Sequence, residues 1–159
     1  MTGSRKAVVT LPTDTQILIT RDFDAPRDLV YKAWTTPELI KRWWGANHGE
    51  VTSVDVDLRV GGSWRYVMTA NAGFEVAFHG EYKDIVTNER IVSTEVFEGM
   101  PDAPALTTNT FAGTDGRTTV TILVEHTHPE HRDAHINSGM EDGLQEAMNL
   151  LDEVINSLR

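Results

Sequence analysis

Residues 138–158, "SGMEDGLQEAMNLLDEVINSL", decide the fold predicted for this chain. Apolar side chains recur there every three or four residues, which is typical of a helix with one buried face. This apolar stripe consists of Met140, Leu144, Ala147, Met148, Leu151, Val154, Ile155 and Leu158. At about 1.5 Å per residue the helix is about 30 Å long, enough to lie across a whole sheet. The segment therefore predicts a long C-terminal helix packed on a sheet.

The preceding residues, 50–126, alternate between apolar and polar side chains, a pattern typical of strands. Glycine and asparagine interrupt the alternation, which predicts turns between antiparallel strands. A similar alternation occupies residues 15–24. We therefore expect seven strands, at 15–24, 50–58, 62–71, 74–86, 90–98, 105–112 and 117–126.

Two short helices are expected between the first strand and the other six. Pro26 and Pro37 stand where a first helical turn tolerates proline, and Gly45 suits the left-handed end of a helix. The order is thus one strand, two helices, six strands and one helix. This order predicts an α+β domain in which a curved antiparallel sheet packs against the C-terminal helix.

The chain of 159 residues has the length of one domain. Residues 1–14 show no sustained periodicity, and we expect a flexible N-terminal arm there. Residues 15–158 are then expected to form the single domain.

The sequence contains no cysteine, which excludes disulfides, thiolate catalysis and cysteine-ligated metal centres. It has no apolar run that resembles a signal peptide or that reaches the roughly 20 residues of a membrane-spanning helix. We therefore expect a cytoplasmic protein that does not enter a membrane.

Acidic residues outnumber basic ones, and the formal net charge is −10. Residues 1–48 carry seven Lys and Arg against five Asp and Glu, a net charge of +2. Residues 49–159 carry seven against nineteen, a net charge of −12. Because such a surface repels phosphate backbones, we expect no nucleic-acid partner.

Residues 20–45, "TRDFDAPRDLVYKAWTTPELIKRWWG", resemble the signature of the Hsp90-ATPase-activator-homologue-like family. This family lies within the START/Bet v 1-like superfamily, which includes polyketide cyclases. Residues 57–68, 79–92 and 138–155 resemble the family's Gly-Gly hairpin, its Gly-x-Tyr and Arg-Ile strands, and its final helix. The resemblance covers residues 15–157 in the expected order.

This resemblance implies the helix-grip fold, in which a seven-stranded sheet wraps around the C-terminal helix and leaves an apolar cavity between them. It implies that a small hydrophobic molecule binds there, without established catalysis and without a cofactor. Two alternatives stay open: a cyclase- or hydrolase-type enzyme acting on an apolar substrate in the same cavity, and a protein-binding module that modulates a chaperone ATPase. The sequence also leaves open whether the protein forms a homodimer.

The sheet and the final helix supply the side chains expected to line this cavity. Aromatic rings offer flat walls and methionine repacks at low cost, which suits varied apolar ligands. The expected lining is Trp44, Trp64, Tyr66, Met68, Val76, Phe78, Tyr82, Met140, Leu144 and Met148. The alternative is that these side chains interdigitate and leave no room.

Catalysis would need an ionisable or polar side chain that points into the cavity. Glu95 and Asn109 are the candidates, because strand alternation places His79 and Glu81 on the solvent side. The sequence leaves open which face of strand 90–98 points inward. Ordinary solvent-facing side chains are the alternative, so no catalytic residue is assigned.

A histidine cluster extends from His126 to His135. His131 and His135 have the i, i+4 spacing that lets two imidazoles reach one metal ion. Arg132, however, stands where the H-E-x-x-H zinc motif has glutamate, and no third ligand is specified. We expect a solvated helix start here and no metal site, while metal binding by the cluster stays open.

Trp43 and Trp44 stand at the end of the second short helix. Consecutive helical residues point about 100° apart, so the two indoles face different ways. We expect Trp43 to pack in the core and Trp44 to lie nearer the cavity.

Overall fold

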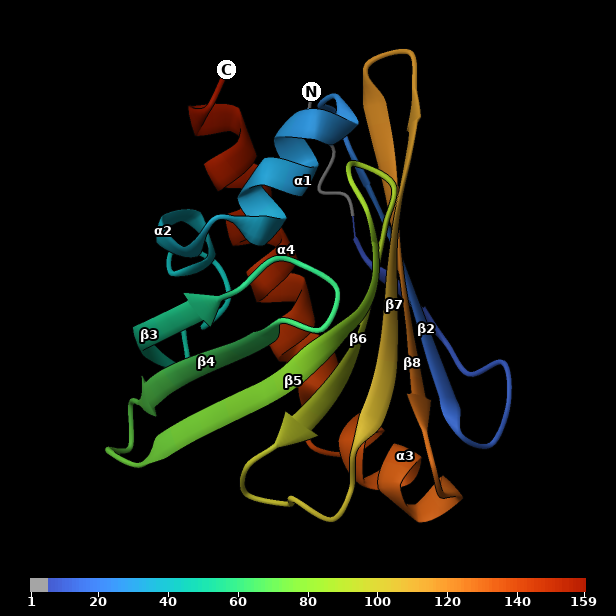
Figure 1. The fold of residues 1–159 in the computed structure, drawn as a ribbon. Coiled ribbons are helices and arrows are strands. Elements are labelled where there is room, and N and C mark those ends of the chain that lie inside the picture. The colour runs from blue at the N-terminus through green and yellow to red at the C-terminus, as the bar shows by residue number, and fades with distance from the viewer. Residues whose placement is uncertain (1–5) are drawn as a thin grey trace.

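Eight antiparallel strands form the curved sheet of the protein, whose computed structural model describes residues 6–159. The strand order is β1-β2-β8-β7-β6-β5-β4-β3 (Figure 1). The strands are β1 (Val8–Thr10), β2 (Gln16–Phe23), β3 (Gly49–Val56), β4 (Ser63–Ala70), β5 (Glu75–Val86), β6 (Arg90–Phe97), β7 (Ala105–Thr114) and β8 (Arg117–His126). The predicted α+β helix-grip fold is confirmed, and each of the seven predicted strands is present.

Strand β1 is the eighth strand, which the sequence did not predict. It lies within residues 1–14, where an arm was expected; residues 1–5 lie outside the described residues. Strand β1 pairs with β2, and Gln145 holds the chain just before it. Gln145 Oε1 accepts a hydrogen bond from Ala7 N at 3.0 Å, and Gln145 Nε2 donates one to Ala7 O at 2.7 Å. The count of seven strands needs this correction because three residues are too few to show periodicity.

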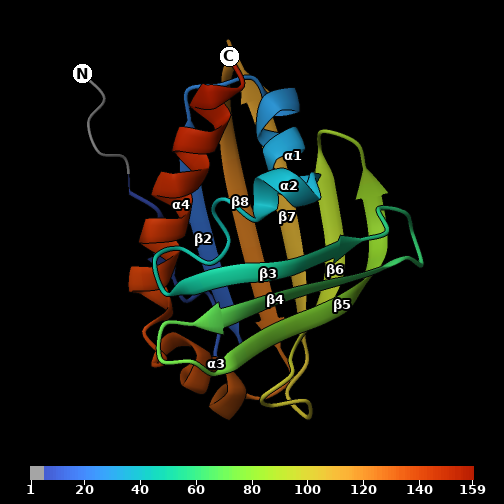
Figure 2. The ribbon, with the colours of Figure 1, turned by 90° about the vertical axis from the view of Figure 1, so that its left-hand side faces the viewer.

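The sheet bends between its two halves. Strands β3, β4 and β5 turn away from β6, β7, β8 and β2, as Figures 1 and 2 show. A register shift between Tyr82 and Asp84 interrupts the pairing of β5 with β6, and another lies between Val51 and Ser53 in β3. Such irregularities bend a strand and increase its twist. The bend gives the sheet a concave side that faces the C-terminal helix.

Four helices complete the fold: α1 (Arg27–Thr35), α2 (Pro37–Ile40), α3 (Pro129–Ile136) and α4 (Met140–Ser157). Helix α4 runs along the sheet, with α1 and α2 near its C-terminal half (Figure 2). The predicted apolar stripe is its buried face, and Leu151 and Ile155 have no exposed surface. Within the described residues, none of the helices is both long and apolar enough to cross a membrane.

Helix α2 is shorter than predicted. It spans four residues, and Trp43 and Trp44 follow it in a series of turns. The left-handed conformation expected at Gly45 is found at Ala46, whose φ is 52°. Gly45 instead permits a close approach, because a Cβ atom there would lie 2.9 Å from Val51 Cγ2. The turns after α2 therefore press tightly against β3.

Trp43 belongs to the hydrophobic core. Its Nε1 donates a hydrogen bond to Ala33 O at 3.0 Å, and its ring centroid lies 5.2 Å from that of Trp34. Trp34 in turn meets the ring of Phe111 on β7 edge-on, at 5.6 Å between centroids. These contacts tie α1 and the turns after α2 to the sheet.

Candidate ligand-binding cavity

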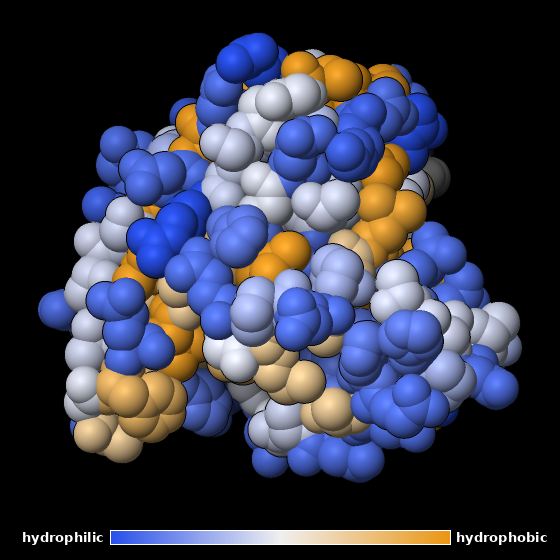
Figure 3. Space-filling view, turned by 60° about the horizontal axis from the view of Figure 1, so that its bottom comes forward, coloured by the Kyte–Doolittle hydropathy of each residue, from blue (hydrophilic) through white to orange (hydrophobic). Residues whose placement is uncertain are grey.

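A cavity of about 370 Å³ lies between the sheet and α4. Strands β2, β4, β5, β6, β7 and β8 border it, together with α4, the ends of α1 and α3, and the turns after α2. The exposed His48 belongs to the lining, so the cavity reaches the surface beside this residue. On the lower face of the molecule, hydrophilic side chains predominate and hydrophobic ones appear in separate patches (Figure 3).

Aromatic rings form one wall of the cavity. The Trp44 ring meets Tyr66 and Phe78 almost perpendicularly, at 5.3 and 5.6 Å between centroids. The Tyr66 ring also lies 4.8 Å from that of Trp64. Contacts of this geometry favour defined ring positions. The aromatic wall is therefore held in place by its own contacts.

Helix α4 forms another wall with flexible and small side chains. Met140, Leu144 and Met148 border the cavity, as do Gly143 and Ala147 between them. Methionine adapts its shape to what it contacts, whereas glycine and alanine leave volume free. This wall can therefore change its shape more easily than the aromatic wall.

All ten side chains predicted to line the cavity border it. They come from the turns after α2, from β4 and β5, and from α4. They are Trp44, Trp64, Tyr66, Met68, Val76, Phe78, Tyr82, Met140, Leu144 and Met148. These side chains surround open space, and their role in binding a ligand stays a prediction.

The inward face of β6 is the one that carries Glu95. Ile91, Ser93 and Glu95 border the cavity. On the opposite face, the Thr94 hydroxyl oxygen accepts a hydrogen bond from Glu81 N at 2.9 Å. Both candidates for chemistry, Glu95 and Asn109, therefore lie in the cavity lining.

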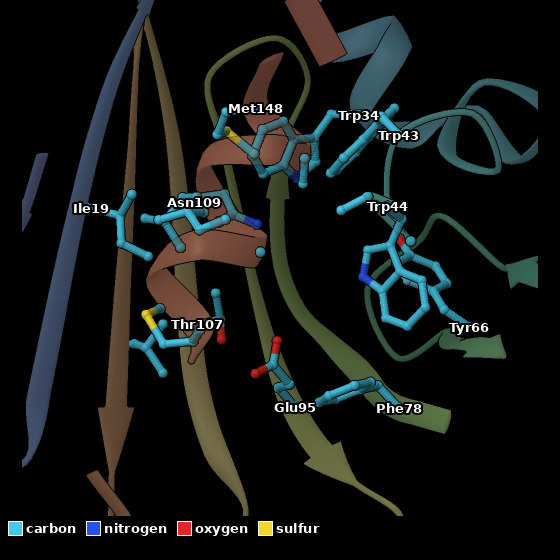
Figure 4. Close-up of a pocket in the computed structure, with 18 of the residues that line it drawn as sticks. Ile19, Trp34, Trp43, Trp44, Tyr66, Phe78, Glu95, Thr107, Asn109 and Met148 are labelled. Carbon is cyan, nitrogen blue, oxygen red and sulfur yellow. The ribbon is translucent and has the colours of Figure 1, made fainter. Parts of the chain in front are cut away.

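Four polar side chains form a row on β6 and β7, which we call the polar row: Ser93, Glu95, Thr107 and Asn109. Ser93 stands opposite Thr107 in the strand register. Glu95 and Asn109 each lie two residues further along their own strand and so share the same face. Because the two strands are antiparallel, Glu95 and Asn109 flank the Ser93–Thr107 pair on opposite sides. In Figure 4 the side chains of Glu95, Thr107 and Asn109 point into the cavity. One side of an otherwise apolar chamber is therefore polar.

Several buried atoms of the lining have no hydrogen-bond partner among the described residues. They include Thr107 Oγ1 and Asn109 Oδ1 of the polar row, and Trp64 Nε1 on β4. Thr107 is only 6% exposed. A buried polar atom left unpaired costs about 1–3 kcal/mol. The lining therefore offers hydrogen-bonding capacity that the protein itself does not use.

Burial raises the pKa of the Glu95 carboxyl from 4.5 to about 7, because a low-dielectric surrounding disfavours the charged form. Among the described residues, neither lysine nor arginine borders the cavity. Burial also raises the pKa of Tyr66, with smaller contributions from Tyr82 and Glu95. The cavity thus contains one carboxyl group that titrates near neutral pH.

Sequence reasoning missed several lining residues outside the sheet, among them Trp34, Trp43, His48 and His135, and most of those on β2, β6, β7 and β8. The missed residues on these four strands are Ile19, Ile91, Ser93, Thr107, Ile122 and Val124. The place of Thr107 in the lining could have been predicted from that of Asn109, since residues two apart on a strand share a face. The place of Ser93 could have been predicted from that of Glu95 in the same way, but only once the inward face of β6 is known.

The histidine cluster lies at the junction of β8 and α3. His126 Nε2 and His135 Nδ1 are 3.0 Å apart. Within residues 6–159, no group of three or more His, Asp or Glu side chains is arranged to hold a metal ion. Burial lowers the pKa of His126 to about 4 and also lowers the pKa of His135. The predicted helix start is confirmed, because α3 begins at Pro129.

Comparison with known families identifies the chain. The model of the family described as "Activator of Hsp90 ATPase homolog 1-like protein" matches residues 24–156. The chain belongs to this family. A search of curated proteins finds no significant match.

Solved structures share the fold of this Hsp90-activator-homolog-like chain. A protein from Rhodobacter sphaeroides is 24% identical, with a TM-score of 0.89 over 96% of this chain and 99% of that chain. A protein from Mycobacterium smegmatis is 26% identical, with a TM-score of 0.82 over 93% and 96% of the two chains. The AHSA1-like protein from Aeromonas hydrophila is 21% identical, with a TM-score of 0.69 over 89% and 93%. These similarities support the fold and identify no ligand.

Trp43 and Trp44 both border the cavity, but only Trp43 is buried in the core, so the two should differ in their contribution to stability. Trp43→Ala should lower the free energy of unfolding by about 3–5 kcal/mol, because it removes a buried indole and its hydrogen bond. Trp44→Ala should cost clearly less, because Trp44 is only partly buried whereas Trp43 is 5% exposed. Urea denaturation of both variants measures the difference, and equal losses would contradict the assignment.

Replacing Glu95 by glutamine should change how stability depends on pH. The native carboxyl holds its proton up to about pH 7, whereas the unfolded one loses it near 4.5. The native state therefore binds the proton more tightly, and the wild type loses stability as the pH rises between these values. The full loss corresponds to about 3 kcal/mol.

Glu95→Gln should consequently be more stable than the wild type at pH 8, and the difference should vanish near pH 4. Glu81→Gln is the matched control, since Glu81 is exposed on the outer face of β5. Thermal or urea denaturation across this pH range measures the effect. A constant difference between wild type and Glu95→Gln would rule out the raised pKa.

Proposed function

We propose that this protein binds a small hydrophobic molecule in the cavity between the sheet and α4. The observation that supports this proposal is the cavity itself, with a volume of about 370 Å³ and a largely apolar lining. Pockets for small molecules typically measure about 300–1,000 Å³ and combine apolar walls with a few polar groups. Protein interiors otherwise leave few voids larger than a water molecule.

The construction of the walls also suits a ligand. Trp44, Tyr66 and Phe78 are fixed by mutual edge-to-face contacts, whereas Met140 and Met148 can rearrange. Burial of apolar ligand surface contributes about 25 cal/mol per Å², which favours a ligand with an extended apolar body. A rigid aromatic wall facing an adaptable helix accepts a class of related molecules rather than a single shape.

Catalysis on a bound ligand is a second candidate, favoured by the position of Glu95. A cyclase- or hydrolase-type reaction needs an ionisable group inside the cavity with a pKa near the working pH. Glu95 borders the cavity, and burial raises its pKa to about 7. Under this candidate function, Glu95→Gln would abolish turnover of an apolar ester or cyclisable substrate.

Filling the cavity tests the binding proposal. Naphthylmethanol, a neutral aromatic probe, should quench tryptophan fluorescence and bind saturably, because the Trp44 ring borders the cavity. Ala147→Leu places a larger side chain in the lining and should weaken binding about ten-fold or more. Isothermal titration calorimetry gives the two affinities.

Glu153→Leu is the matched control, because it introduces the same side chain on the exposed face of the same helix. It should leave the affinity for naphthylmethanol unchanged. Circular dichroism establishes that both variants are folded. The proposal fails if the wild type does not bind the probe saturably, or if Ala147→Leu and the control bind it equally well.

A further inference from the structure

We infer that the ligand of this cavity is an amphipathic amine, whose apolar or aromatic body lies against the aromatic wall and whose cationic nitrogen lies at Glu95 on the polar row. This inference rests on the proposed function, since it names the chemical class of the molecule that the cavity binds. Its evidence is the arrangement of the lining: one carboxyl, an unpaired hydroxyl oxygen at Thr107 on the neighbouring strand, and aromatic rings.

The polar row would be unfavourable beside a purely apolar ligand. Thr107 Oγ1 and Asn109 Oδ1 already lack partners among the described residues, and an apolar ligand would exclude water from them as well. Each such atom would then cost about 1–3 kcal/mol. A ligand with several N–H groups at one end can donate hydrogen bonds to Glu95 and to the neighbouring Thr107, because carboxylate and hydroxyl oxygens both accept them.

The protein itself supplies no cation for Glu95. No lysine or arginine in the described chain borders the cavity. The titratable groups that do border it are Tyr66 on β4, Tyr82 on β5, His135 on α3 and His48 in the turns after α2. Helix α4 and strand β7 contribute no ionisable side chain to the lining.

Neither histidine is free to serve as that cation. His135 Nδ1 lies 3.0 Å from His126 Nε2, and burial lowers the pKa of both rings, which favours their neutral forms. His48 Nε2 lies 3.3 Å from Glu146 Oε2 at the surface. The two tyrosines are acids whose charged form is an anion. A cation that pairs with the Glu95 carboxylate would therefore come from the ligand.

The aromatic wall suits a cation as well as an apolar body. The faces of aromatic rings carry partial negative charge and attract ammonium groups within about 6 Å. The Trp44 ring stands at large angles to the rings of Tyr66 and Phe78, and all three border the cavity. The net charge of −10 further favours a cationic ligand over an anionic one during association.

Three probes with the same ring system separate the contribution of charge from that of apolar contact. Naphthylmethylamine is a cation, naphthylmethanol is neutral, and naphthoic acid is an anion at pH 8. The wild type should bind the amine about ten-fold more tightly than the alcohol, and the acid least of all. In Glu95→Gln the preference for the amine over the alcohol should disappear, whereas Glu81→Gln should keep it.

A second readout reports protons directly. Near pH 7 the Glu95 carboxyl is about half protonated, since its pKa is about 7. Binding of a cation favours the carboxylate, so about half a proton should be released per amine bound. Calorimetry in two buffers of different ionisation enthalpy measures this release, which should be absent for naphthylmethanol and for Glu95→Gln. At pH 5, where Glu95 is protonated, the preference for the amine should shrink.

The outcomes distinguish this inference from the proposed function. If amine and alcohol bind the wild type equally well, the inference is wrong and the cavity is a site for apolar ligands. If the acid binds most tightly, Glu95 acts as a neutral hydrogen-bond donor, which also overturns the inference. If none of the three probes binds the wild type, the proposed function fails with it. A preference that Glu95→Gln retains would place the cation elsewhere.

Discussion

The packing of helix α4 is the constraint on which the rest of the structure depends. Its C-terminal half lies in the core, where Leu151, Val154 and Ile155 are almost completely buried. Its N-terminal half carries Met140 and Leu144, which are only partly buried and border the cavity. Because a helix is stiff, anchoring one half fixes where the other half stands. The bent sheet then leaves space beside the N-terminal half, and the cavity is that space.

The cavity lining reduces stability, and the proposed ligand would offset part of this cost. A carboxyl whose pKa burial raises to about 7, together with unpaired atoms on Thr107 and Asn109, is unfavourable in an interior that serves only folding. Apolar side chains of similar size would pack there at lower cost. Sites of this kind occur where a protein meets a ligand, because the ligand supplies the missing partners. Burial of apolar side chains in the core around Trp43 and Leu151 offsets the free-energy cost of this lining.

The sequence predicted those parts of the fold in which apolar side chains recur at regular spacing. The apolar stripe of α4 and the alternation in the longer strands sufficed for the architecture and for all ten predicted lining residues, which are mostly large and apolar. Strand β1 escaped prediction because three residues show no period. The predicted end of α2 was wrong, because tertiary contacts of Trp43 and Gly45 favour turns over a continued helix.

The inward face of β6 could not be read from its sequence, because both faces carry residues of mixed polarity. Only the pairing of β6 with β7 and the bend at β5 show that Glu95 shares the cavity with Thr107 and Asn109. The grouping of the four side chains into the polar row could therefore not be predicted from the sequence. Which side chains of neighbouring strands lie together depends on how the strands pair, and periodicity within one strand does not show this pairing.

A crystal structure of the wild type with naphthylmethylamine bound at pH 8 tests the central claim most directly. The naphthyl ring should lie among Trp44, Tyr66 and Phe78, and its nitrogen should lie within about 3 Å of a Glu95 carboxylate oxygen. The account would be contradicted if protein side chains filled the space between the sheet and α4, or if the probe bound outside it.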